Sequence, residues 1–225
     1  MTYWILFIGI SLVSWLVQRN LNSKFEKYSQ WRMTGNLTGR DVAERMLREN
    51  GVDNGSIRPV SGSLSDFFNP TDMTVNLSES VYDSNSVAAA AVAAHECGHA
   101  VQHRTGYSML VLRTKLVPVV TFASQWMTWV LLAGILLVEV FPALLMLGIA
   151  MFALTTLFSF VTLPVEVDAS RRAVKWLETA GITRGADTEA AKDALHAAAY
   201  TYVAAALGSL ATLVYYVLMV LGRRD

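Results

Sequence analysis

Two histidines four residues apart, His95 and His99, with Glu96 between them, form the most informative pattern in this sequence. Residues at this spacing lie on one face of an α-helix, so both imidazoles can bind one metal ion while Glu96 lies beside them. Zn²⁺ accepts neutral imidazole nitrogens and lowers the pKa of a bound water, and a neighbouring carboxylate can take the proton from that water. The pattern therefore predicts a zinc hydrolase site with Glu96 as the general base.

A surface helix with two solvated histidines is the alternative, and the preceding segment argues against it. Residues 87–94 are all alanine or valine, so this stretch is apolar on every side and is expected to be buried. A buried helix with two histidines and a glutamate needs partners for them, and a metal ion is the simplest partner. A serine or asparagine within residues 84–86 should cap this helix, which is expected to end near Arg104.

Two histidines leave a catalytic zinc site incomplete, because such sites take a third protein ligand. The single cysteine, Cys97, lies about 200° around the helix from His95 and is expected to point into the core. His103 lies one turn beyond His99 and is expected at the rim of the site. Gly98 leaves out a side chain near the metal, which should let a substrate approach closely.

Glu166 and Asp168 are the acidic candidates for the third ligand, just after an apolar run that ends at Leu163. A carboxylate close to a membrane end is costly unless it is paired or bound. If Pro164 starts a helical turn, the two acids point to nearly opposite sides, so only one can face the metal. The alternative is that both acids pair with the arginines at 171–172, and the spacing alone does not decide between these possibilities.

The composition indicates an integral membrane protein, since 53% of the 225 residues are hydrophobic and 16% are charged. Three runs are long enough to cross a bilayer and contain at most one charge, Glu139 in the middle run. The middle run is long enough to cross twice, with a turn near Glu139. The first run has no basic region before it and no cleavage site after it, so we expect an uncleaved anchor. The four expected transmembrane helices are about 3–18, 117–138, 142–163 and 198–221.

The expected organisation alternates membrane and polar segments. These are a transmembrane anchor at 1–18, a catalytic region at 19–115, a transmembrane hairpin at 116–163, a polar segment with the third zinc ligand at 164–197, and a transmembrane helix with a C-terminal tail at 198–225. The two polar segments contain sixteen of the eighteen lysines and arginines. Because such residues concentrate on the cytoplasmic side, the active site is predicted to face the cytoplasm. The net charge of zero gives no reason to expect nucleic acid as a partner, and the single cysteine suits a reducing compartment.

The catalytic region contains signals for a helix and two strands. Thr38 and Asp41 resemble a capping box that opens a helix. Residues 57–60 are expected to form an edge strand, because Pro59 lacks a ladder donor, and residues 61–72 are expected to form a loop. Residues 73–77 alternate strictly, as a half-buried strand does. This last strand is expected to be the exposed sheet edge beside the metal helix, where an extended peptide could bind.

Together these segments resemble the neutral zinc metallopeptidases of bacterial membranes, the YugP-like family, over nearly the whole chain. The matching segments are 37–39, 65–70, 74–78, 93–102, 163–172 and 202–207. The resemblance implies a mainly α integral membrane fold with about four transmembrane helices and a small α+β zincin-like catalytic region. It also implies Glu166 as the third ligand of a His-His-Glu zinc site. Related membrane metallopeptidases often place an aspartate four residues after that glutamate. Here Ser170 occupies the position, and Asp168 is the candidate for its role.

The resulting prediction is a membrane-embedded zinc metalloendopeptidase that cleaves polypeptides, including membrane proteins, at the cytoplasmic face of the bacterial plasma membrane. Its partners are Zn²⁺, the lipid bilayer and the substrate, and the oligomeric state is left open. His196, Tyr200 and Tyr202 are candidate oxyanion donors, although interfacial anchoring explains the tyrosines as well. The alternative is a non-proteolytic scaffold with a structural zinc, but such a site has no use for Glu96 and normally closes with four protein ligands. A transporter is disfavoured, because the expected spans contain almost no ionisable residues.

Overall fold

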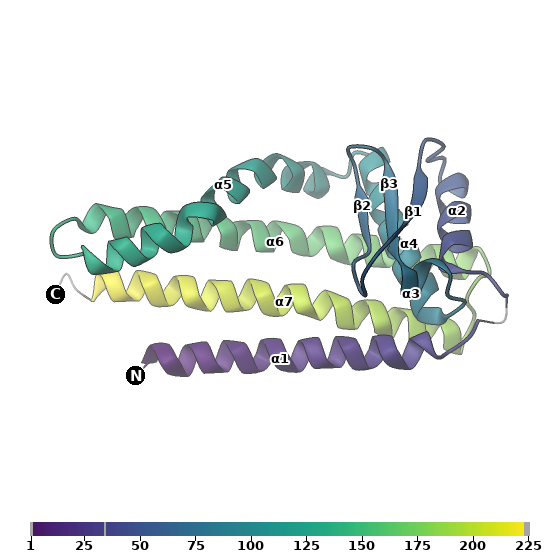
Figure 1. Ribbon diagram of the computed structural model, residues 1–225, viewed down its shortest axis with the longest axis horizontal. Helices are drawn as coiled ribbons and strands as arrows, with labels where there is room; N and C mark the ends of the chain where they lie inside the picture. The colour runs from purple at the N-terminus through teal and green to yellow at the C-terminus, as the bar shows by residue number, and fades with distance from the viewer. Residues whose placement is uncertain (1, 34, 223–225) are drawn as a thin grey trace. The chain divides into compact units, whose positions relative to one another are not determined.

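The computed structural model describes residues 2–33 and 35–222. In chain order the elements are α1 (Thr2–Ser29), α2 (Gly39–Glu49), β1 (Ser56–Val60), β2 (Phe67–Asn69), β3 (Thr74–Ser78), α3 (Glu79–Tyr82), α4 (Val87–Arg104), α5 (Ser108–Leu136), α6 (Pro142–Thr179) and α7 (Ala186–Leu221) (Figure 1). Two compact units share the long helices. The apolar unit contains residues 111–163 with the start of α1 and the end of α7, and the polar unit contains residues 17–110 and 164–201.

The four longest helices confirm the expectation of four candidate membrane spans. Trp4–Ser29, Ser108–Leu136, Pro142–Thr179 and Ala186–Leu221 are each long and apolar enough to cross a bilayer. The expected turn between the second and third spans is also present, because α5 ends at Leu136 and α6 begins at Pro142. Inside the apolar unit, a small core forms around Leu131, Leu145 and Ile149.

The third apolar helix continues well past the expected end of its span. Pro164 lies inside α6, which runs without interruption to Thr179. Packing stabilises the second half of the helix, since every fourth residue is fully buried: Val165, Ala169, Ala173 and Leu177. A stripe at this spacing covers one face of a helix, and its burial outweighs the backbone hydrogen bond that a proline removes. Glu166 and Asp168 therefore project from a regular helix.

The capping box is present as predicted and fixes the start of α2. The Thr38 side chain accepts a hydrogen bond from the backbone of Asp41, and the Asp41 carboxylate accepts one from the backbone of Thr38. Val42, Met46 and Leu47 are buried on the inner face of the helix. The pKa of Asp41 is lowered, because the Thr38 side chain and backbone both donate hydrogen bonds to its carboxylate.

The sheet has the order β1-β3-β2, with β1 parallel and β2 antiparallel to β3. β1 is an edge strand, as Pro59 predicted. Two expectations were wrong. The segment expected to be a loop contains β2, and the strand expected at the exposed edge, β3, is the central strand. All five residues of β3 are buried. Because the strand order puts β2 at the other edge, β2 is the edge strand that contacts α4.

Alternation misled the prediction for β3 because its polar side chains are bonded inside the protein instead of facing water. Thr74 Oγ1 donates to Asp72, and Asn76 Nδ2 donates to Thr74 Oγ1 at 3.0 Å. The Ser78 backbone N–H and hydroxyl both donate to the Asp66 carboxylate. Satisfied polar groups can be buried at little cost, so a polar position in a strand need not be a solvent-facing one.

The metal helix α4 has the boundaries that the sequence predicted. Ser86 is its N-cap, with its side chain accepting from the Ala89 backbone N–H, and the helix ends at Arg104. Small side chains over residues 87–94 let neighbouring elements pack closely on all sides, and most of the stretch is fully buried. In the polar unit, α2, α3, β2 and β3 all contact α4 (Figure 1), and residues of α6 and α7 complete the same core.

Candidate metal centre

Two helices bring three metal-binding side chains together in the polar unit. α4 contributes His95 and His99, whose rings lie 4.8 Å apart between centroids and nearly perpendicular. α6 contributes Glu166, whose Oε2 lies 3.3 Å from His95 Nε2 and 3.5 Å from His99 Nε2. In the part of the chain that the structure describes, these three residues are the one cluster with donor atoms close enough to share a metal ion.

The two nitrogen–oxygen spacings fit zinc, and all three donor atoms lie within 4.8 Å of one another. Ligand atoms at about 2.0–2.2 Å from a zinc ion in a tetrahedron lie about 3.3–3.6 Å from one another, and the two nitrogen–oxygen distances fall in or near this range. Two imidazoles and one carboxylate form a donor set that zinc accepts in catalytic sites, with a fourth position left open. The residues present therefore fit the metal that the sequence predicted.

Gln102 determines which nitrogen of His99 faces the centre. Its amide nitrogen donates to the Val165 backbone oxygen at 2.8 Å and to Asp168 Oδ2 at 2.9 Å. Its amide oxygen is therefore left to accept from His99 Nδ1, 3.0 Å away. With the Nδ1 hydrogen in this bond, neutral His99 directs the Nε2 lone pair at Glu166. Two acceptors that face each other at 3.5 Å are satisfied by a cation between them, which is either a proton on His99 Nε2 or a metal ion.

Ser170 is the corresponding partner of His95. The Ser170 hydroxyl lies 3.1 Å from His95 Nδ1, one helical turn beyond Glu166 on α6. The resemblance suggested that Asp168 replaces the aspartate found at this position in related enzymes. The structure instead has Ser170 itself in contact with the histidine, while Asp168 reaches the centre only through Gln102.

Asp168 lies outside the cluster. Its Oδ2 accepts from Arg172 Nε at 2.5 Å and from Gln102, so the pairing with the neighbouring arginines that the sequence left open is present for this acid. Sequence reasoning missed both Gln102 and Ser170. The signal that could have found them is spacing, because Gln102 follows His99 by three residues and Ser170 follows Glu166 by four, which places each one turn away on the same helix face.

Gly98 has a different role from the one expected. A Cβ atom at this position would lie 2.7 Å from the backbone oxygen of Ala169 on α6. The missing side chain therefore lets the α6 backbone approach α4, not a substrate. This close approach brings Glu166 within reach of the two histidines.

Glu96 is buried beside the cluster without belonging to it, with 9% of its surface exposed. Burial is the main cause of a raised pKa for its carboxyl group, and the charges of Glu166 and Asp66 add to the increase, while His95 and His99 oppose it. Asp66, which directly precedes β2, is therefore near enough to interact with Glu96. The pKa of His99 is also raised, because its bond to Glu166 and the nearby carboxylate charges outweigh the effect of burial.

The cluster does not include the other candidate residues. Cys97 is fully buried with its Sγ 3.7 Å from the Ala43 backbone oxygen, as predicted, and burial raises the pKa of its thiol. His103 is exposed, with its ring 6.0 Å from that of Phe68. His196 lines a groove between α6 and α7, and Tyr200 is 58% exposed. Oxyanion stabilisation by either residue, or by Tyr202, stays a prediction.

Comparison with known proteins agrees with this centre. Residues 3–221 match the model of a protein family described as "Putative neutral zinc metallopeptidase". The chain belongs to this family. The family implies Zn²⁺ as the cofactor, which the donor set of His95, His99 and Glu166 suits.

A curated relative matches over nearly the full length of both chains. It is named "Putative membrane protease YugP", from Bacillus subtilis (strain 168), and is 42% identical over 213 residues, which cover 95% of this chain and 94% of the relative. No solved structure matches the chain. The zinc metallopeptidase family and the relative named as a membrane protease support a protease function, and the four apolar helices suggest a membrane protein.

Proposed function

We propose that this protein is a zinc endopeptidase that cleaves polypeptides at the cytoplasmic surface of the membrane, with His95, His99 and Glu166 as metal ligands and Glu96 as general base. The observation that carries the proposal is the convergence of three metal-binding atoms from α4 and α6 with spacings near those of a tetrahedral zinc site. Glu96 lies directly beside this set in the buried wall of the centre.

Each side chain then has a distinct task. A bound zinc ion would act as a Lewis acid, lowering the pKa of water and polarising the scissile carbonyl group. The Glu96 carboxylate accepts a proton from the attacking water and passes it to the nitrogen of the leaving amine. Gln102 and Ser170 hold the rings of His99 and His95 through their Nδ1 atoms, so that Nε2 stays directed at the centre.

The edge strand β2 is the natural place for the substrate backbone. It pairs with β3 on one side only and contacts α4, which carries Glu96. An extended peptide that adds to such an edge is held straight by backbone hydrogen bonds, whatever its sequence. We therefore propose that the peptide lies along β2, with the scissile bond towards Glu96.

A structural zinc site in a non-proteolytic scaffold is the rival function. Structural sites normally close with four protein ligands, whereas the described residues supply three to this cluster. A buried glutamate beside the metal also has no task in a structural site. Both observations favour catalysis.

Glu96→Gln tests the proposed mechanism. The variant should keep zinc at wild-type stoichiometry and lose proteolysis, including self-cleavage, because the amide cannot accept the proton. Glu44→Gln, an exposed site on α2, is the matched control and should keep full activity. Equal activity of Glu96→Gln and wild type would contradict the role of Glu96 as general base. Loss of zinc in Glu96→Gln would show instead that Glu96 is a metal ligand.

The place of action follows from the chain position of Glu166, which is three residues past the end of the apolar run at Leu163. At 1.5 Å per residue, the metal should lie roughly within 10–15 Å of the hydrocarbon edge. One cytosolic peptide sequence, free and tethered beside a transmembrane helix, should be cut faster in the tethered form. Faster cutting of the free form would contradict this.

The side of the membrane has its own test. A cysteine introduced at Asn54 should resist an impermeant thiol reagent in intact cells and react after the membrane is opened. Ready labelling in intact cells would put the active site on the outer face.

A further inference from the structure

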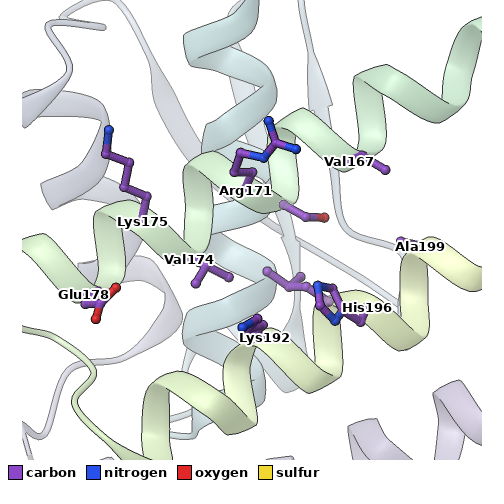
Figure 2. A pocket seen from close by; sticks show the side chains of 10 residues that line it. Val167, Arg171, Val174, Lys175, Glu178, Lys192, His196 and Ala199 are labelled. Carbon is purple, nitrogen blue, oxygen red and sulfur yellow. The ribbon is translucent and has the colours of Figure 1, made fainter.

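A groove between α6 and α7 in the polar unit lies outside the metal cluster and is not used by the proposed reaction. It encloses about 370 Å³. Its lining combines basic side chains with one acid and an apolar wall: Arg171, Lys175, Lys192, His196, Glu178, Val167, Val174, Leu195, Ala199 and Ser170. Figure 2 shows Lys192 and His196 rising from α7 towards Val174 of α6, while the basic ends of Arg171 and Lys175 extend from α6 on the side away from α7.

The charge of this groove is positive and weakly compensated. Arg171, Lys175 and Lys192 are three permanent cations, and Glu178 is the one acid among the lining residues. Within the described residues, the one ion pair of these three cations is a 4.0 Å contact between Lys192 and Glu189, both largely exposed. Such a pair contributes little, so the groove can accept an anion.

The groove also lies where two apolar helices enter the polar unit. Arg171 is eight residues past Leu163 on α6, and Lys192 is five residues before the uncharged run that begins at Ala197 on α7. At 1.5 Å per residue these are about 12 Å and about 7.5 Å of helix. Long basic side chains on a membrane helix can extend towards the interface from such positions, while Lys175, twelve residues past Leu163, is about 18 Å along α6 from the same point.

The position of Ser170 argues against a binding pocket for substrate side chains. Ser170 lines the groove and contacts His95 at Nδ1, while the metal-binding nitrogen of the same ring is Nε2. The groove is thus behind the histidine ring, on the side away from the metal. A pocket that receives a substrate side chain next to the scissile bond must open towards the metal instead.

We propose that this groove binds the phosphate of an anionic phospholipid, with Lys192 and His196 facing the phosphate from α7 and Arg171 and Lys175 adding positive charge from α6. Basic pockets between membrane helices are suited to anionic headgroups. The apolar wall of Val167 and Val174 would contact the glycerol and upper acyl part of the same molecule. The inference does not depend on proteolysis, because binding can be measured on protein without activity.

Native mass spectrometry of the purified full-length protein with phosphatidylglycerol, and with phosphatidylcholine for comparison, tests the proposal. Wild type should retain phosphatidylglycerol preferentially. Lys175→Gln/Lys192→Gln should bind it roughly 30-fold more weakly, at about 1 kcal/mol for each basic residue near an anionic surface. Arg40→Gln/Arg48→Gln, which removes two charges from exposed positions on α2, is the matched control and should bind like wild type.

A second groove variant, Arg171→Gln/Lys192→Gln, should show the same loss, and unchanged thermal unfolding midpoints would exclude misfolding as its cause. Equal retention by groove and control variants, or no preference for phosphatidylglycerol, would overturn the proposal. Binding of inorganic phosphate without retention of phosphatidylglycerol would assign the site to a soluble anion and overturn the proposal that its ligand is a lipid. Displacement of the lipid by a short acidic peptide at equal concentration would overturn it in favour of a peptide site.

Discussion

Gly98→Ala is the substitution that most directly tests how the metal centre is assembled. The added Cβ atom would lie 2.7 Å from the Ala169 backbone oxygen and 3.2 Å from the Ala169 carbonyl carbon and Cα. Those atoms belong to a helix backbone and cannot rotate away as a side chain would. The two helices must therefore move apart, and they hold opposite parts of the ligand set, with His95 and His99 on α4 and Glu166 on α6.

The smallest possible movement follows from the tightest contacts that Cβ atoms make. Restoring a contact of 3.0–3.4 Å from 2.7 Å requires a shift of about 0.3–0.7 Å. Metal–ligand distances in a functional site tolerate about ±0.2 Å, so Glu166 could no longer complete the site without strain. We expect zinc affinity to fall by roughly 10–100-fold, as it does when a ligand loses its support.

Protein stability should change much less than zinc affinity. Overpacking costs about 1–3 kcal/mol, and alanine has a better helix propensity than glycine by about 1 kcal/mol. The two effects partly cancel and leave a net loss of roughly 0–2 kcal/mol. A variant that is folded but poor in zinc is therefore the expected product.

Zinc content after dialysis against graded chelator, together with far-UV circular dichroism and thermal unfolding, measures both effects. Gly9→Ala is the control, since Gly9 is also within a helix and a Cβ there would meet nothing within 4 Å. It should gain helix propensity and keep zinc. If Gly98→Ala holds zinc as tightly as wild type, the close approach of α4 to α6 does not set the ligand spacing, and the assembly described above is wrong.

Three further substitutions test the ligands and the fold. Glu166→Ala should lose zinc under mild chelation, whereas Asp168→Ala should keep it with affinity weakened by roughly 10–100-fold through the loss of its bond to Gln102; the reverse result would make Asp168 the ligand. Asp41→Asn should lower stability by roughly 0.3–1 kcal/mol at pH 7, because a negative charge at a helix N-terminus is favourable. The Asp41 carboxyl has a lowered pKa, so its stabilisation is complete above about pH 4 and disappears as pH falls through its folded pKa. The difference in thermal unfolding midpoint between wild type and Asp41→Asn should therefore stay constant from pH 7 to about pH 5 and shrink progressively below about pH 4. A difference that does not shrink on acidification would contradict this origin.

The local features of this protein were readable from the sequence, because they depend on neighbours within one or two turns. The boundaries of α4 follow from a serine cap and a run of small apolar residues, and the start of α2 follows from the capping box at Thr38. The four candidate spans follow from the length of uncharged runs. The inward direction of Cys97 follows from helix geometry alone.

The strand order and burial of the sheet could not be predicted from the sequence and depend on tertiary contacts. Strict alternation in β3 is the pattern of a half-exposed strand. Its Thr74 and Ser78 hydroxyls can nevertheless be buried, because they donate hydrogen bonds to the carboxylates of Asp72 and Asp66, which lie outside the strand. β2 has only three residues, too few for a periodic pattern, and it exists because β3 offers it a partner. Its place at the sheet edge was therefore invisible in the sequence.

The metal centre likewise combines features that the sequence predicts with features that depend on tertiary contacts. Spacing alone paired His95 with His99 and placed Glu96 beside them, because all three lie on one helix. Residue types could not choose between Glu166 and Asp168, since that choice depends on which face of α6 packs against α4. The stripe of fully buried residues that includes Val165 and Ala169 fixes that face, and the missing side chain at Gly98 sets the distance. The sequence alone thus determined the chemistry of the centre, while contacts between helices about 70 residues apart decided which carboxylate completes it.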